Sequence, residues 1–225
     1  MNDILLSFIL GLVQGLTEFL PISSSAHLLL PTLIFGSNDL GLYFDISVHA
    51  GTLIAVVYYF RNEIFLMSKS LLVTNNFNED KNLAIQLIIA TIPIVILGFI
   101  FKDLISQRIF SINNIAISNL IFASILLFAF LNNKGKKTLI NITILGACFI
   151  GLFQCFALIP GASRSGAAIT AGLLIGLSLK DASKFAFLLA IPTIIGALTL
   201  LIFDLNNENA SFDLLNICLL YTSDA

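Results

Sequence analysis

The chain has 225 residues, of which 58% are hydrophobic and 11% are charged, and its formal net charge is −2. A soluble protein carries about a quarter charged residues and a little under half apolar ones. The composition therefore excludes a globular enzyme of the aqueous phase and a disordered chain, and the negative net charge argues against nucleic acid as a partner. We expect an all-α protein that crosses a membrane several times.

Apolar runs follow one another along the whole chain, and several approach the roughly 20 residues that span a bilayer. In the first part of the chain they cover residues 4–20, 28–36, 43–60, 83–101 and 113–131. In the second part they cover residues 139–159, 167–179 and 183–203, and a last run begins at residue 212. These runs predict membrane helices, because a helix satisfies its backbone hydrogen bonds within one segment.

Two of the apolar stretches are interrupted by proline, serine and glycine. The interruptions are PISSSAH at 21–27 and PGASRSG at 160–166. Irregular backbone at membrane depth occurs where it is buried in protein or lines a cavity. We therefore expect a functional site at these two turns.

A weak internal repeat relates the two interruptions. FILGLVQ at 8–14 matches FIGLFQ at 149–154 with one residue dropped, and each copy leads to a proline, a serine-rich turn and a short apolar run. Such repeats are typical of membrane proteins built from two structural halves. We expect a single integral membrane domain over residues 1–225, with a first half at about 1–131 and a second half at about 138–225.

The second half is expected to be C-terminally truncated. Three full spans follow the first interruption, whereas one full span and the start of another follow the second. By the repeat, about 35 to 50 further residues are needed at bilayer-crossing length. The polar ending at 221–225 is expected to mark a fragment or a foreign tail, and the chain is expected to be poorly active or unstable.

The basic residues of the loops indicate the orientation in the membrane. Loops 61–82, 132–138 and 179–184 carry lysine or arginine and are expected on the cytoplasmic side. Because 132–138 and 179–184 share a side, the stretch between them is expected to enter the membrane and return as a re-entrant hairpin. By the repeat, residues 1–36 form a matching hairpin of inverted topology, so the two tips are expected to meet near the midplane.

Arg164 gives the second interruption a fixed positive charge. Its guanidinium presents a planar fork that matches phosphate oxygens, and each serine-rich turn precedes a short helix whose N-terminus favours an anion. An arginine at membrane depth is costly and usually has a functional partner. A structural ion pair with Glu18 is the alternative, and the two roles are compatible.

Ionisable and nucleophilic side chains also gather at the first interruption. Gln14 and Glu18 are four residues apart and share a helix face, and a carboxylate in this apolar stretch needs a cation, a proton or a metal. His27 follows Ser24 by three residues, so it is suited to act as a general base toward a serine or water; a hydrogen-bonded packing role is the alternative. His49 lies inside a long apolar run, and we expect it to be a packing residue.

The two interruptions carry a family resemblance. QGLTEFLPISSSAH at 14–27 and PGASRSG at 160–166 resemble the two signature regions of the bacterial undecaprenyl-diphosphate phosphatases, which also confer bacitracin resistance, and FDISVHAGTL at 44–53 is similar too. The resemblance implies hydrolysis of undecaprenyl diphosphate to undecaprenyl phosphate and inorganic phosphate, which recycles the lipid carrier of peptidoglycan synthesis. It also implies a multi-pass protein of the bacterial plasma membrane, with an active site that faces the exterior.

The resemblance further implies roles for individual residues. Ser24 is expected to be the nucleophile and His27 its base, with water activated at His27 as the close rival. Glu18, also expected to be catalytic, is expected to hold a divalent cation, magnesium or calcium, together with Gln14. The expected phosphate contacts come from Ser23, Gly161, Ser163, Ser165 and Arg164, the last of which also stabilises charge in the transition state.

A transporter is the alternative function. Inverted halves with re-entrant tips are transporter architecture, and a polyprenyl-phosphate flippase would use the same Arg164 and helix N-termini without a nucleophile. The SSSAH cluster at 23–27 favours the enzyme. The expected partners are the lipid substrate and membrane lipid, and a homodimer is left open.

Overall fold

The computed structural model describes residues 3–72, 78–107 and 111–207. The first part of the chain forms helices α1 (Asp3–Thr17), α2 (Ser24–Phe35), α3 (Gly41–Tyr59), α4 (Arg61–Leu72), α5 (Glu79–Ile100), α6 (Lys102–Ser106) and α7 (Ile112–Asn132). The second part forms the 3-10 helix η1 (Leu139–Asn141), α8 (Ile144–Gln154), the 3-10 helix η2 (Cys155–Leu158), α9 (Arg164–Leu174) and α10 (Leu179–Asn207). The described ranges contain no β-strand, which confirms the expected all-α class.

Within the described residues, three helices are long and apolar enough to cross a membrane, namely α5, α7 and the Leu179–Phe203 part of α10. Shorter apolar helices cover Ile4–Thr17, Ser24–Phe35, Phe44–Tyr59 and Ile144–Leu158. Large apolar side chains such as Phe8, Leu16 and Leu145 are exposed on these helices, and extensive exposed apolar surface suits contact with lipid. The protein is therefore a multi-pass membrane protein.

Several boundaries differ from the predicted ones. The loop expected at 61–82 begins with helix α4, which carries Arg61, Glu63 and Lys69 and buries Met67, so charge alone was a poor guide to irregular structure. The apolar run at 139–159 is divided into η1, α8 and η2. The helices after the two interruptions begin earlier than the apolar runs, at Ser24 and Arg164. At α9 the preceding Ser163 caps the helix, and serine is a favoured helix cap.

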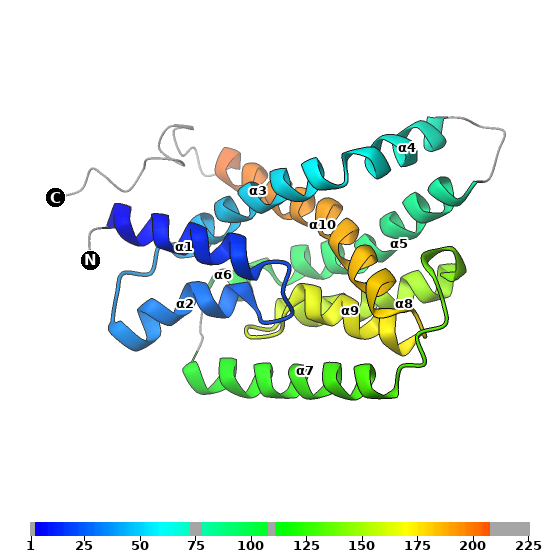
Figure 1. The fold of residues 1–225 in the computed structure, drawn as a ribbon. Coiled ribbons are helices and arrows are strands. Elements are labelled where there is room, and N and C mark those ends of the chain that lie inside the picture. Colours follow the sequence, from blue (N-terminus) through cyan, green and yellow to red (C-terminus); the bar gives the residue numbers. More distant parts are fainter. Residues whose placement is uncertain (1–2, 73–77, 108–110, 208–225) are drawn as a thin grey trace.

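Two helical hairpins, α1–α2 and α8–α9, enter the molecule from opposite ends, and their turns meet in its middle (Figure 1). Ser165 Oγ of one hairpin donates to the carbonyl oxygen of Leu20 in the other over 3.0 Å. A Cβ placed on Gly166 would lie 3.4 Å from Pro21 Cβ. The predicted meeting of the two turns is thus observed, while their depth in the membrane and the internal repeat stay predictions.

Helix α9 lies at the centre of the packing, and all of its residues from 165 to 173 are buried. It packs against α7, α8 and α10. Small side chains allow this close approach; a Cβ placed on Gly172 would lie 2.9 Å from Ala182 Cβ of α10. This packing holds Arg164, the first residue of α9, in a defined position beside the first hairpin.

The lysine-bearing connections lie together at one end of the molecule. Lys137, between α7 and α8, donates its backbone N–H to Gly176 O over 3.0 Å, which joins this connection to the one between α9 and α10. Lys184 of α10 donates to Glu63 of α4 over 3.0 Å. The predicted common side of these three connections is therefore observed, and its assignment to the cytoplasm stays a prediction.

Candidate active site

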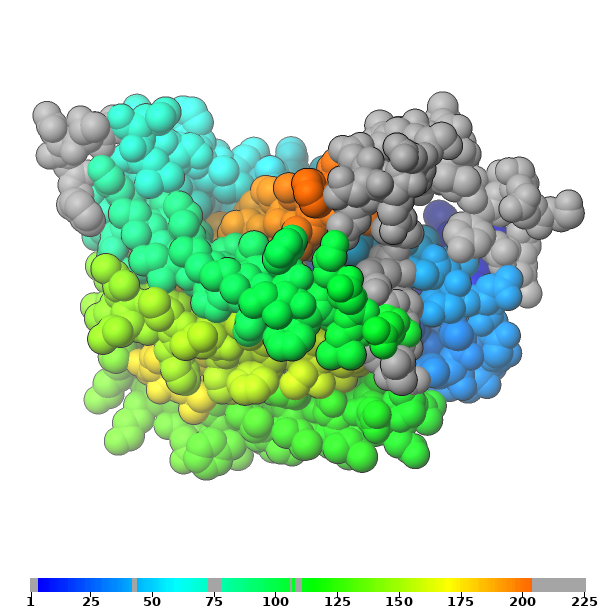
Figure 2. All heavy atoms as spheres, turned by 180° about the vertical axis from the view of Figure 1, so that it is seen from behind, coloured from blue at the N-terminus to red at the C-terminus, as the bar shows by residue number. Residues whose placement is uncertain are grey.

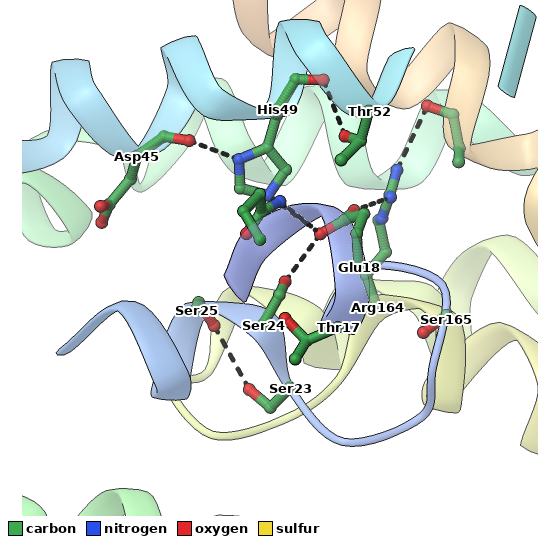
Figure 3. A network of polar contacts seen from close by, with 12 residues as sticks. Thr17, Glu18, Ser23, Ser24, Ser25, Asp45, His49, Thr52, Arg164 and Ser165 are labelled. Carbon is green, nitrogen blue, oxygen red and sulfur yellow. Dashed lines mark hydrogen bonds and ion pairs between the residues drawn. The ribbon is translucent and has the colours of Figure 1, made fainter. Parts of the chain in front are cut away.

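Glu18 is the centre of a polar network at the meeting of the two hairpins (Figure 3). It follows α1 and is 4% exposed. Its Oε2 accepts hydrogen bonds from Gln14 Nε2 and from Ser24 Oγ, both over 2.7 Å, and lies 3.4 Å from His49 Nε2. Its Oε1 pairs with the guanidinium of Arg164. One buried carboxylate thus joins side chains from α1, α2, α3 and α9.

The first turn is shaped so that Ser24 returns to Glu18. The Glu18 N–H bonds Gln14 O over 2.9 Å, which extends α1 by one residue, and the helix-breaking Pro21 follows shortly afterwards. Ser23 then adopts a left-handed conformation with φ 60°, which costs a non-glycine residue about 1–2 kcal/mol. Backbone strain of this kind concentrates at functional sites, and here it directs the start of α2 toward Glu18.

The start of α2 has an uncapped N-terminus. Ser23 precedes the helix, yet its side chain makes no capping hydrogen bond; its Oγ lies 3.3 Å from Ser25 Oγ instead. The first N–H groups of a helix have no partner within the helix and carry partial positive charge. Because Ser24 is the first residue of this helix, its hydroxyl lies where an anion would be stabilised.

Arg164 begins the helix after the second turn, and its guanidinium has a partner in the first hairpin and another in α10. Ser163 caps α9 by accepting from Gly166 N–H over 3.1 Å, so Arg164 follows the cap directly. The guanidinium pairs with Glu18 and also donates to Ala190 O of α10 over 3.2 Å. The ion pair considered as an alternative role for Arg164 is therefore present, and its phosphate-binding role stays a prediction.

The contacts of the two histidines differ from those expected from the sequence. His49 Nε2 faces the Glu18 carboxylate and its Nδ1 contacts the carbonyl oxygen of Asp45, so the expectation that His49 only packs was wrong. His27 Nδ1 contacts Ser23 O over 2.8 Å, while the Ser24 hydroxyl donates to Glu18 rather than to His27. In this arrangement Glu18 is the group placed to accept the Ser24 proton.

Both ring nitrogens of His49 face oxygens that can only accept. A carbonyl and an ionised carboxylate donate no hydrogen, so both contacts are hydrogen bonds only when the ring carries two protons. Asp45, four residues before His49 on α3, supplies the carbonyl that orients the ring. Helical spacing relates these two residues, but only tertiary packing brings them to Glu18, which explains why the sequence did not reveal the contact.

Gln14 leaves one oxygen without a partner. The residue is 1% exposed, its Nε2 donates to Glu18, and its buried Oε1 has no hydrogen-bond partner among the described residues. Such an orphan oxygen points to a water or an ion. In the described ranges no group of three or more His, Cys, Asp or Glu side chains could hold a metal. The expected magnesium or calcium site at Gln14 and Glu18 would therefore need most of its ligands from water and substrate, and it stays a prediction.

The remaining predicted phosphate ligands have structural partners. Ser163 Oγ lies 3.1 Å from Ser165 Oγ, and Ser165 links the two turns through Leu20 O. Gly161 has φ 91° and approaches the backbone of α7 so closely that a Cβ would lie 2.5 Å from Ile115 O. Gly161 is therefore required by backbone geometry, and contacts from these residues to phosphate stay predictions.

We expect Gly161→Ala to lower the free energy of unfolding by about 2–4 kcal/mol, because it combines a disfavoured positive φ with overpacking against Ile115. Thermal unfolding in detergent measures the effect. Gly98→Ala is the matched control, since a Cβ there meets nothing within 4 Å and the exchange raises helix propensity by up to about 1 kcal/mol. Equal unfolding temperatures for Gly161→Ala and the parent would contradict the close approach.

Comparison with known proteins places these features in a family. Residues 7–222 match the family model described as bacitracin resistance protein BacA. A relative from Alcanivorax borkumensis named undecaprenyl-diphosphatase is 47% identical over 194 residues, which are 85% of this chain and 73% of the relative. A second, from Alteromonas mediterranea and of the same name, is 45% identical over 209 residues, or 91% of this chain and 78% of the relative. Both alignments extend over most of the chain described above.

Proposed function

The chain belongs to the bacitracin resistance protein BacA family, and from this premise we propose that it is an integral membrane phosphatase. Its substrate would be undecaprenyl diphosphate, and its products undecaprenyl phosphate and inorganic phosphate. The reaction would recycle the lipid carrier of peptidoglycan synthesis and confer bacitracin resistance. The relatives' shared name, undecaprenyl-diphosphatase, supports this substrate.

One observation carries the proposal: a serine hydroxyl, a carboxylate and a guanidinium meet where the two hairpin turns touch. Ser24 Oγ lies 2.7 Å from Glu18 Oε2, and Arg164 pairs with the other oxygen of the same carboxylate. Phosphoryl transfer needs a positioned nucleophile, a proton acceptor and positive charge for the phosphate oxygens. These three side chains supply all of them.

In the proposed first step, Ser24 Oγ attacks the terminal phosphorus and its proton passes to Glu18 Oε2. The bond from that phosphorus to the bridging oxygen breaks, and undecaprenyl phosphate leaves. In the second step water attacks the phosphorus of the phosphoserine and the bond from Ser24 Oγ to phosphorus breaks. Glu18 returns its proton to Ser24 Oγ, and inorganic phosphate leaves with the protons of the water. Glu18 thereby takes the base role first assigned to His27, and His49 orients its carboxylate.

Arg164 would bind the phosphate while it remains anchored to the protein. A guanidinium has five N–H donors, and its contacts with Glu18 and Ala190 leave others for phosphate oxygens. The uncapped N-terminus of α2 adds backbone N–H groups beside Ser24. Together they would stabilise the charge of the transferring phosphoryl group.

Glu18 and Gln14 Oε1 would hold the divalent cation, magnesium or calcium, together with the substrate. Such a cation neutralises part of the diphosphate charge. The buried Oε1 without a partner supports this placement.

An apolar cavity of about 500 Å³ would take the part of the lipid tail nearest the diphosphate. It lies between α5, α6, α7 and η2 and reaches Pro160 in the second turn. Ile115, whose carbonyl is approached by Gly161, also lines it. A volume in this range is typical of small-molecule sites, so the cavity is suited to the first isoprene units rather than to the whole tail.

We expect Ser118→Phe, which fills this cavity, to raise KM for undecaprenyl diphosphate about tenfold, because it removes tail contacts worth roughly 1–2 kcal/mol. The same variant should leave hydrolysis of inorganic diphosphate, which has no isoprene unit, nearly unchanged. Ser124→Phe serves as the control, since Ser124 is on the same helix and exposed. Equal effects on both substrates would rule out a tail site here.

The proposed setting is the bacterial plasma membrane, with the active site open to the exterior. The end of the molecule that carries Lys137 and Lys184 would face the cytoplasm, in keeping with the positive-inside rule. The hairpins and their touching turns also suit a flippase, but the nucleophile and base at Glu18 favour hydrolysis.

Phosphate release from undecaprenyl diphosphate by the purified chain in detergent tests the function. Hydrolysis needs no membrane gradient, so we expect phosphate release above the enzyme-free background with magnesium or calcium present, and loss of this release in Arg164→Ala. Lipid movement across vesicle membranes without phosphate release would support the flippase and refute the phosphatase.

A further inference from the structure

A pocket of about 440 Å³ lies away from the active site, at the lysine-bearing end of the molecule. One part of its wall is polar, formed by Lys137, Asn141 and Thr143, and another is apolar, formed by Leu145, Phe149 and Leu174. In the view from behind, α8 forms part of the outer face between α5 and α7 (Figure 2). We propose that this pocket binds an anionic phospholipid, with its headgroup phosphate at the lysines and an acyl chain along α8.

The charge of the pocket rim suits an anion. Lys137 lines the pocket, and Lys134 and Lys136 are its near neighbours in the sequence. All three lysines are exposed, and residues 132–143 include no Asp or Glu. Among the described residues these lysines form no ion pair, in contrast to Lys184, which pairs with Glu63. Basic clusters next to membrane helices recognise anionic headgroups at the bilayer surface, so the cluster has charge that a lipid phosphate would complement.

The rim is held in place by backbone contacts. Lys137 N–H bonds Gly176 O over 3.0 Å, and Ser178 N–H bonds Lys137 O over 2.9 Å. Thr143 Oγ1 accepts from Gly146 N–H over 3.1 Å and caps α8. The positive end of the α8 dipole therefore lies at the same rim. The backbone that carries Lys137 and the N-terminus of α8 are therefore both held in place at the rim of the pocket.

The apolar wall distinguishes a lipid from free phosphate. Leu145 is 81% exposed beside the rim, and Phe149 and Leu174 continue the apolar surface into the pocket. Exposed apolar side chains next to a cationic rim match the two parts of a phospholipid, a charged headgroup and a hydrocarbon chain. We therefore assign the site to a lipid of the leaflet at this end of the molecule.

Native mass spectrometry of the full chain in detergent, titrated with phosphatidylglycerol or phosphatidylcholine, tests the proposal. We expect saturable binding of phosphatidylglycerol at one site and much weaker binding of phosphatidylcholine. The variant Lys136→Gln/Lys137→Gln should weaken phosphatidylglycerol binding about 25-fold, since each basic residue near an anionic surface contributes about fivefold. Leu145→Asn should weaken it severalfold without unfolding, because the residue is exposed.

The variant Lys69→Gln/Lys81→Gln removes the same charge elsewhere on the chain and should change the affinity less than twofold. An equal loss in this control would show a general surface charge effect and overturn the site. Full competition by millimolar inorganic phosphate, or unchanged binding in Leu145→Asn, would assign the pocket to a free anion instead. Equal affinity for the two lipids would also refute the proposal.

Discussion

Arg164→Ala is expected to lower phosphatase activity about a thousandfold or more, the range lost with an arginine that stabilises a transferring phosphoryl group. It is also expected to lower the free energy of unfolding by about 3–5 kcal/mol, because it leaves the buried Glu18 carboxylate without the guanidinium that pairs with it. Phosphate release and thermal unfolding in detergent measure the two effects. The substitution therefore tests the catalytic role and the stabilising role of Arg164 together.

A double variant separates the two effects. Glu18→Gln/Arg164→Met removes both charges, and replacing a buried ion pair with neutral side chains is often neutral or stabilising. We expect this variant to unfold near the parent temperature and still to lack activity. Activity near the parent level in Arg164→Ala would contradict the assignment of Arg164, and low activity combined with full stability in that variant would contradict the energetic role of the ion pair.

Ser24→Ala is expected to reduce kcat by at least about a thousandfold, because it removes the proposed nucleophile, and loss of a catalytic serine is severe in comparable two-step enzymes. Its effect on stability should be small, about 1 kcal/mol, since one hydrogen bond to Glu18 is lost. Steady-state hydrolysis of undecaprenyl diphosphate and thermal unfolding are the measurements. If Ser24→Ala kept most activity while His27→Ala abolished it, attack by water activated at His27 would replace the serine mechanism.

Two substitutions of His49 test how the Glu18 carboxylate is positioned. His49→Ala should lower kcat about a hundredfold by releasing the Glu18 carboxylate, within the range of positioned acid–base groups. His49→Gln keeps a donor toward Glu18 and should recover part of the loss at unchanged KM. If kcat fell as far in His49→Gln as in His49→Ala, the positioning role of His49 would be contradicted.

The sequence predicted the site most reliably where a local rule applied. Pro21 and Pro160 interrupt apolar runs, so the two turns could be located from composition alone, and the four-residue spacing of Gln14 and Glu18 placed them on one helix face. His49 was missed because 31 positions separate it from Glu18 and no helical spacing relates them. Contacts of that kind arise from the packing of α3 beside the first hairpin.

In the fold, too, local sequence patterns predicted some features, while others arise only from packing. The long spans α5, α7 and α10 follow from runs of apolar residues, whereas α4 was hidden by its charged residues and α6 by its five-residue length. Gly161 was expected at the phosphate because it lies in the second turn, yet its φ of 91° and its approach to Ile115 are properties of the packed backbone. Rules of residue spacing apply within one helix, so they do not predict close contacts between the backbones of two segments.

The stereochemistry of hydrolysis tests the central claim, a phosphoserine formed at Ser24, most directly. An undecaprenyl diphosphate analogue with a terminal thiophosphate made chiral by oxygen isotopes would be hydrolysed in labelled water. Each in-line displacement inverts the phosphorus, so two displacements through Ser24 predict net retention of configuration. Net inversion would show a single attack by water and contradict the account.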